Sequence, residues 1–86
     1  MILNEHVKIR EEKFGAVIFE TLREKVFVTN STGKDILNLL EKDYPQEKII
    51  EVLADDYGLN PVDIKEDVFN FISQLKENKI IKVITQ

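Results

Sequence analysis

The stretch KVFVTNSTGKDILNLL (residues 25–40) joins two different structural patterns with only a few polar residues between them. Its first part is rich in β-branched and aromatic residues, which favour a β-strand. Its second part carries apolar residues at helical spacing from Ile36 to Leu40. The Asn, Ser and Thr at positions 30–32 offer side-chain oxygens that can cap a helix. The stretch therefore predicts a strand that passes directly into an amphipathic helix.

Two further strands are predicted on the N-terminal side of this stretch. The segment HVKIREEKFG begins with the period-two alternation of a half-buried strand. Gly15 then permits a tight turn or bulge, and AVIFET (residues 16–21) is nearly all apolar, as in a central strand covered on both faces. Because the links between the strands are short, we expect an antiparallel meander.

Two further helices are predicted on the C-terminal side. The proline in DYPQ ends the first helix, because the residue before proline disfavours the α region. A second helix is expected over residues 46–57, with Gly58 as its C-cap. Pro61 suits the first position of a third helix that continues to about residue 78. The tail IIKVIT (residues 80–85) has strand character.

Length and composition favour a single small domain over residues 1–86. The chain is 43% hydrophobic and 33% charged, an ordinary soluble composition. No secretion signal or membrane-spanning run is visible, so we expect a cytoplasmic protein. We also expect it to be a monomer. The net charge of −4 argues against nucleic acid as the main partner.

The inventory of reactive side chains is sparse. The sequence has no cysteine, which excludes a thiolate metal site, a disulfide framework and a cysteine nucleophile. His6 is the only histidine, and neither a G-x-G-x-x-G motif nor a P-loop is present. We therefore expect no catalytic residues, no bound metal and no cofactor in this chain.

The predicted third helix has an uneven distribution of charge around its axis. At about 100° per residue, its core stripe contains Ile64, Val68, Phe71, Ile72 and Leu75. One flank combines an aromatic residue with positive charge, through Lys65, Phe69, Lys76 and Lys79. The acidic residues lie on the opposite flank. Two interpretations are open: either Phe69 widens the core and the lysines are solvated, or this flank forms a groove wall suited to an acidic amphipathic peptide.

The whole pattern resembles a known family. Three strands followed by VFVTNSTGKDILNLLEK and then by PQEKIIEVLADDYGLNPVDIKEDVFNFISQLKENKII are similar to the PQQ synthesis protein D (PqqD) family. That family is the archetype of the RiPP recognition element, a leader-peptide-binding domain of ribosomal peptide biosynthesis. The segment REEKFGAVIFE is also similar to members that accompany radical SAM peptide-modifying enzymes, including the mycofactocin system. The implied fold class is α+β and winged-helix-like, with an N-terminal three-stranded antiparallel sheet packed on a three-helix bundle.

The resemblance also implies a site. Members of the family bind the leader as an added strand on the edge of the third strand, in a groove closed by the third helix. In this sequence the implied edge consists of Lys25, Val26, Phe27, Val28 and Thr29. The expected groove wall consists of Lys65, Phe69, Ile72 and Lys76. Which of the strand residues face the leader is left open by the sequence.

The implied function is a non-catalytic peptide chaperone that presents a precursor to a modifying enzyme, and we expect a radical SAM maturase as the partner. An alternative is a winged-helix DNA-binding regulator, because the fold class is shared. Its reading helix would be expected to carry arginine or lysine toward the DNA. Here both arginines, Arg10 and Arg23, lie outside the third helix, and the lysines of that helix are offset by its acidic residues. A third hypothesis is a structural subunit of the maturase without affinity for the leader.

Overall fold

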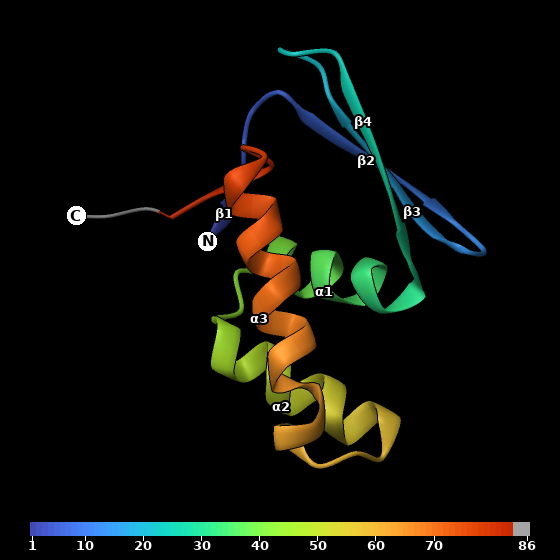
Figure 1. Ribbon diagram of the computed structural model, residues 1–86, viewed down its shortest axis with the longest axis vertical. Helices are drawn as coiled ribbons and strands as arrows, with labels where there is room; N and C mark the ends of the chain where they lie inside the picture. The colour runs from blue at the N-terminus through green and yellow to red at the C-terminus, as the bar shows by residue number, and fades with distance from the viewer. Residues whose placement is uncertain (84–86) are drawn as a thin grey trace.

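The computed structural model describes residues 1–83, which include a three-stranded antiparallel sheet and three helices (Figure 1). The strands of this sheet are β2 (Val7–Glu12), β3 (Gly15–Glu20) and β4 (Lys25–Asn30), in the order β2-β3-β4. The predicted central strand is therefore β3, and β4 lies at one edge. The expected α+β class, with this sheet and three helices, is confirmed.

The helices follow the sheet in the chain, and their ends agree with the local signals of the sequence. They are α1 (Ser31–Glu41), α2 (Gln46–Tyr57) and α3 (Pro61–Glu77). Among the three candidate caps of α1, the side chain of Asn30 accepts the N–H of Gly33 at 3.0 Å. Gly58 ends α2 in the left-handed conformation that glycine adopts without a steric penalty.

The core lies where the helices meet one face of the sheet. Ala16 and Ile18 of β3 are buried on this inner face, and α1 packs against both β3 and β4. Each helix contributes the apolar stripe that its sequence predicted, including Ile36 and Leu40 from α1 and Val68 and Ile72 from α3. Burial of apolar surface of this kind is the main favourable term in folding.

The outer face of the sheet has no helix packed on it in Figure 1. Val17 is nevertheless buried there, and the guanidinium of Arg10 lies 5.4 Å from the centre of the Phe19 ring. Such a cation–π contact covers an aromatic ring that would otherwise face water. The outer face is thus partly shielded at β2 and β3. It is open at β4, where Val26 and Val28 are exposed.

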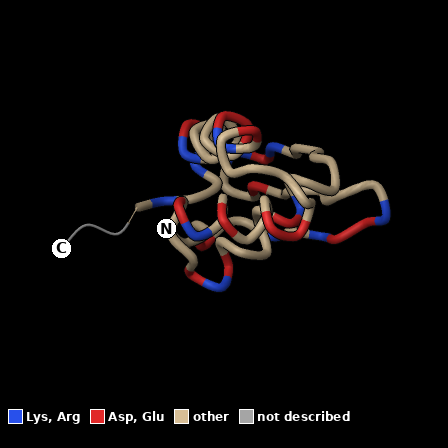
Figure 2. Tube along the Cα trace, turned by 90° about the horizontal axis from the view of Figure 1, so that it is seen from below, with Lys and Arg blue, Asp and Glu red and all other residues tan. Residues whose placement is uncertain are grey.

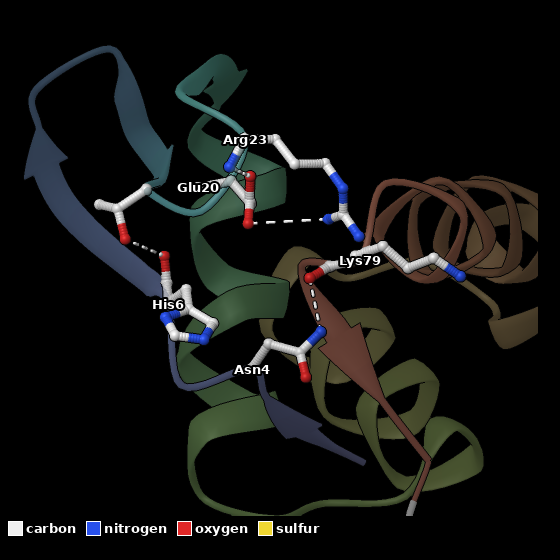
Figure 3. A network of polar contacts seen from close by, with 6 residues as sticks. Asn4, His6, Glu20, Arg23 and Lys79 are labelled. Atoms are coloured by element: carbon white, nitrogen blue, oxygen red, sulfur yellow. Dashed lines mark hydrogen bonds and ion pairs between the residues drawn. The ribbon is translucent and has the colours of Figure 1, made fainter.

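The two ends of the chain pair with each other, which the sequence did not predict for the N-terminus. The short strand β1 (Ile2–Leu3) is antiparallel to β5 (Ile81–Lys82). Asn4 reinforces this pairing, because its backbone N–H donates to the carbonyl of Ile80 and its side chain donates to that of Lys79 (Figure 3). Part of the strand expected over residues 80–85 is present as β5, and its last two residues lie outside the described part of the chain.

The link between β3 and β4 is fastened by a buried carboxylate. Glu20 is 2% exposed, and it accepts the backbone N–H of Arg23 at 2.8 Å (Figure 3). The guanidinium of Arg23 lies 3.7 Å from the other oxygen of the same carboxylate. Glu24 then adopts a left-handed conformation, with φ of 57°. These contacts fix the start of β4 relative to β3.

Candidate functional site

The edge of the sheet at β4 lies close to α1 and α3. Within residues 1–83 the sheet has the order β2-β3-β4, so β4 pairs only with β3, and its other side carries backbone groups without a partner in this range. All five strand residues singled out from the sequence lie on it: Lys25, Val26, Phe27, Val28 and Thr29. An unpaired strand edge is a template for a further strand.

The hydrogen-bond pattern of β3 establishes which of its residues bond to β2. The N–H of Thr21, just after β3, donates to the carbonyl of His6 at 2.8 Å, which continues the β2–β3 ladder by one pair. Backbone groups of alternate strand residues point in opposite directions within a sheet. Val17 and Phe19, which share the parity of Thr21, therefore bond to β2, and Ile18 bonds to β4.

The same alternation sets the direction of the backbone groups of β4. Ile18 is paired with Phe27, and Ala16 is paired with Thr29, so Phe27 and Thr29 direct their N–H and C=O groups toward β3. The N–H groups of Val26 and Val28 consequently point to the free edge. The side chains alternate between the two faces of the sheet. Phe27 and Thr29 are half-buried on the inner face, whereas Val26 and Val28 are exposed on the outer face.

An apolar groove lies between β4 and α3, and we call it the β4–α3 groove. Its cavity volume is about 190 Å³. The sheet contributes Ile18, Phe27, Val28 and Thr29. The helix side consists of Phe71, Gln74, Leu75 and Asn78, and Ile80 closes the end. The groove thus has an apolar floor and two neutral amide side chains along its helix side.

The structure does not bring the four α3 residues expected as the groove wall to this groove. Lys65, Phe69 and Lys76 are exposed on another flank of α3, and none of them lines the cavity. Ile72 is 1% exposed and belongs to the core. The expected wall is therefore corrected to Phe71, Gln74 and Asn78.

The physical reason for this correction is the rotation of α3 about its axis. Helical periodicity identifies the buried stripe, but two flanks border that stripe, and only packing decides which one faces the sheet. Phe71 was assigned to the core stripe, and it is half-buried because it lies where that stripe meets the groove. Its place in the predicted stripe gave no signal in the sequence that it would also line a groove.

The absence of a side chain at Gly33 allows the two sides of the β4–α3 groove to lie close together. A Cβ atom at this position would lie 1.9 Å from Oγ1 of Thr29 and 3.0 Å from Cζ of Phe71. Since both neighbours line the β4–α3 groove, the missing side chain of Gly33 lets α1 approach β4 and α3 at the same point. The glycine of the NSTG motif is thus explained by close packing.

Gly33→Ala is expected to lower the free energy of unfolding by about 1–3 kcal/mol, the usual cost of overpacking. Chemical denaturation measures this loss. The double variant Thr29→Ala/Gly33→Ala should recover part of it, because the closest clash is with Oγ1 of Thr29. Ser31→Ala, at an exposed position in the same helical turn, is the control and should change stability little. Equal losses for the single and the double variant would contradict this explanation.

Metal ligation and membrane spanning can be assessed over residues 1–83. Within this range no group of three or more His, Cys, Asp or Glu side chains is arranged to hold a metal ion. Nor is any of the described helices both long enough and apolar enough to cross a membrane. Figure 2 shows acidic and basic residues interspersed along the chain.

A free strand edge beside an apolar groove is the arrangement with which domains take up an extended peptide as an additional strand. Comparison with known families supplies the affiliation: the family described as coenzyme PQQ synthesis protein D (PqqD) matches residues 5–81. Because this match covers most of the sequence, the chain belongs to the coenzyme PQQ synthesis protein D family. Among curated protein sequences, none matches this chain.

Two solved structures share this fold. The first is described as TbiB1 in complex with the TbiA(beta) leader peptide; it has a TM-score of 0.88 at 17% identity and covers 100% of both chains. The second is described as lasso peptide synthetase B1 complexed with the leader peptide; it has a TM-score of 0.80 at 19% identity and covers 91% of this chain and 92% of the other. At such identities the similarity concerns the fold.

Proposed function

We propose that this protein is a RiPP recognition element, which binds the leader of a ribosomally made precursor peptide as a strand added to β4. The observation that carries the proposal is the free edge of β4 beside the β4–α3 groove. Membership of the coenzyme PQQ synthesis protein D family supports it. Two proteins of the same fold, both described as leader-peptide complexes, support it further.

The energetics of binding follow from this geometry. The N–H groups of Val26 and Val28 point outward and offer two donors to the carbonyls of an incoming strand. Hydrogen bonds to the backbone provide affinity with little dependence on sequence, and side-chain pockets provide selectivity. Here the pocket is the β4–α3 groove, whose apolar floor and cavity of about 190 Å³ suit a single large apolar side chain.

In this proposal the protein performs no chemistry itself. It presents the precursor to a modifying enzyme, and a radical SAM maturase in the cytoplasm is the partner we propose, with the recognition element acting as a monomer. Its contribution is a high effective concentration of the core peptide at the active site of the enzyme. The DNA-binding alternative is not favoured, since both structural neighbours are described as peptide complexes.

Truncation of the groove aromatic tests this function. Phe71→Ala is expected to weaken binding of the leader about 10- to 150-fold, because burying such a side chain contributes about 1.5–3 kcal/mol. The measurement is calorimetric titration with synthetic leader peptides of candidate precursors encoded near the gene. Since Phe71 also packs against the core, its variant is first checked for a folded circular dichroism spectrum at the temperature of the titration.

Phe69→Ala is the matched control, since Phe69 is an aromatic residue of the same helix that is 54% exposed and does not line the groove. It should bind the leader as the wild type does. Lys65→Glu/Lys76→Glu should also bind within a few-fold of the wild type, because exposed charge pairs contribute only about 0.2–1 kcal/mol each. A large loss for Phe69→Ala together with normal binding by Phe71→Ala would restore the wall expected from the sequence. Failure of the wild type to bind any such leader would refute the function.

A further inference from the structure

The outer face of β4 carries two large apolar side chains next to the free edge. Val26 is 60% exposed and Val28 is 69% exposed. Their paired neighbours on β3 are Phe19 and Val17, so an apolar row crosses the sheet from β3 and stops at β4. Isolated apolar residues on a surface need no explanation, but this row ends at the strand whose backbone donors are unpaired. A strand added to the edge of β4 would therefore cover this apolar row.

The backbone pattern of β4 determines where the side chains of an added strand would lie. We consider an antiparallel addition, which continues the order of the sheet. Residues of the added strand opposite Val26 and Val28 would exchange backbone hydrogen bonds with them, and their side chains would lie on the outer face beside the two valines. The residue between them would face Phe27 and enter the β4–α3 groove.

We propose that the bound segment of the leader carries three consecutive apolar residues. The central one occupies the β4–α3 groove, and its two neighbours cover Val26 and Val28 on the outer face. This inference rests on the proposed function and specifies the chemistry of its ligand. Val26 and Val28 become determinants of specificity in addition to supplying the backbone donors.

A preference for three consecutive apolar residues in the leader would distinguish this protein from one that binds amphipathic strands. A leader that alternates apolar and polar residues would fill the groove but would place polar side chains against the two valines. Cross-strand pairs between apolar side chains stabilise a sheet relative to such mismatched pairs. Replacing either flanking apolar residue of the leader by serine should therefore weaken binding about two- to fivefold.

Selection from a displayed library of short random peptides tests the inference without knowledge of the natural leader. Three proteins are compared: the wild type, Val26→Thr/Val28→Thr and Phe71→Ala. Threonine keeps the β-branched shape and the backbone N–H, so the edge itself is unchanged. The wild type should enrich apolar triplets. The threonine variant should keep the central apolar residue and lose the preference at both flanks, whereas Phe71→Ala should lose the central preference.

The possible results separate the inference from the function on which it rests. Enrichment of a single apolar position with polar flanks, in both the wild type and the threonine variant, would overturn the triplet and leave strand binding intact. If no peptide is enriched by the wild type, strand binding itself is refuted, and the inference falls with it.

Discussion

Val28→Pro is expected to abolish most of the binding of a leader peptide while the protein remains folded. Proline has no N–H, and the N–H of Val28 is one of the donors that point to the free edge of β4. The variant loses one intermolecular hydrogen bond and leaves a carbonyl of the peptide without a partner, at a cost of about 1–3 kcal/mol. Affinity should therefore fall about 5- to 150-fold. Proline is tolerated on an edge strand when its nitrogen faces outward.

Two comparisons make this prediction specific. Val26→Pro should behave in the same way, because its N–H shares the direction of that of Val28. Phe27→Pro should instead destabilise the fold, because this N–H is directed toward β3 and the Phe27 side chain packs against the core. Phe27→Ala measures the part of that loss that is due to the side chain alone.

Val28→Ala keeps the N–H and should lose far less affinity than Val28→Pro. The measurements are calorimetric titration for binding and urea denaturation for stability. If Val28→Pro binds the leader at full strength while it is folded, the edge of β4 is not the site. If Phe27→Pro is as stable as Phe27→Ala, the assigned direction of the backbone groups is wrong.

Gly15→Ala is expected to lower the free energy of unfolding by about 3–5 kcal/mol. Gly15 has φ of 154°, a conformation that residues with a side chain rarely adopt. A Cβ atom there would also lie 2.0 Å from the backbone oxygen of Thr29. Because that neighbour is backbone at the end of β4, relief requires moving the strand itself. A small domain whose total stability is about 5–15 kcal/mol tolerates such a loss poorly.

Gly58→Ala is the matched control for this experiment. Gly58 also has a positive φ, of 67°, but nothing lies within 4 Å of a Cβ atom at that position. Its substitution should cost only the backbone strain of about 1–2 kcal/mol. The difference between the two variants in urea denaturation measures the steric contribution at Gly15. Equal losses would show that the contact with Thr29 contributes nothing.

The sequence by itself determined the order and the ends of most elements of the fold. The apolar stripe of α1, the cap at Asn30, the proline at the start of α3 and the glycine after α2 all depend on residues within a turn or two of each other. Such signals are local, so they can be read along the chain. The position of β4 at an edge followed in the same way, because short links favour the pairing of successive strands.

Pairing between the chain ends was decided by tertiary structure. The strands β1 and β5 have only two residues each and lie at opposite ends of the sequence. A strand of two residues is too short to show a period, and its partner is set by the packing of everything between. The residue 80–85 tail therefore showed strand character in the sequence without revealing what it would pair with.

In the candidate site, the strand edge was expected from the sequence, whereas the helix side of the groove was decided by the tertiary structure. The edge residues Lys25 to Thr29 were implied by the family resemblance, and the structure places all five on one edge strand, where their role in binding stays a prediction. The opposite side of the groove was assigned to Phe69 and its neighbouring lysines, whereas the structure places Phe71, Gln74 and Asn78 there. Periodicity gives the buried stripe of a helix but not the flank that faces a given neighbour. That choice, and with it the direction in which Val26 and Val28 present their N–H groups, was decided only when α3 and the sheet packed on a shared core.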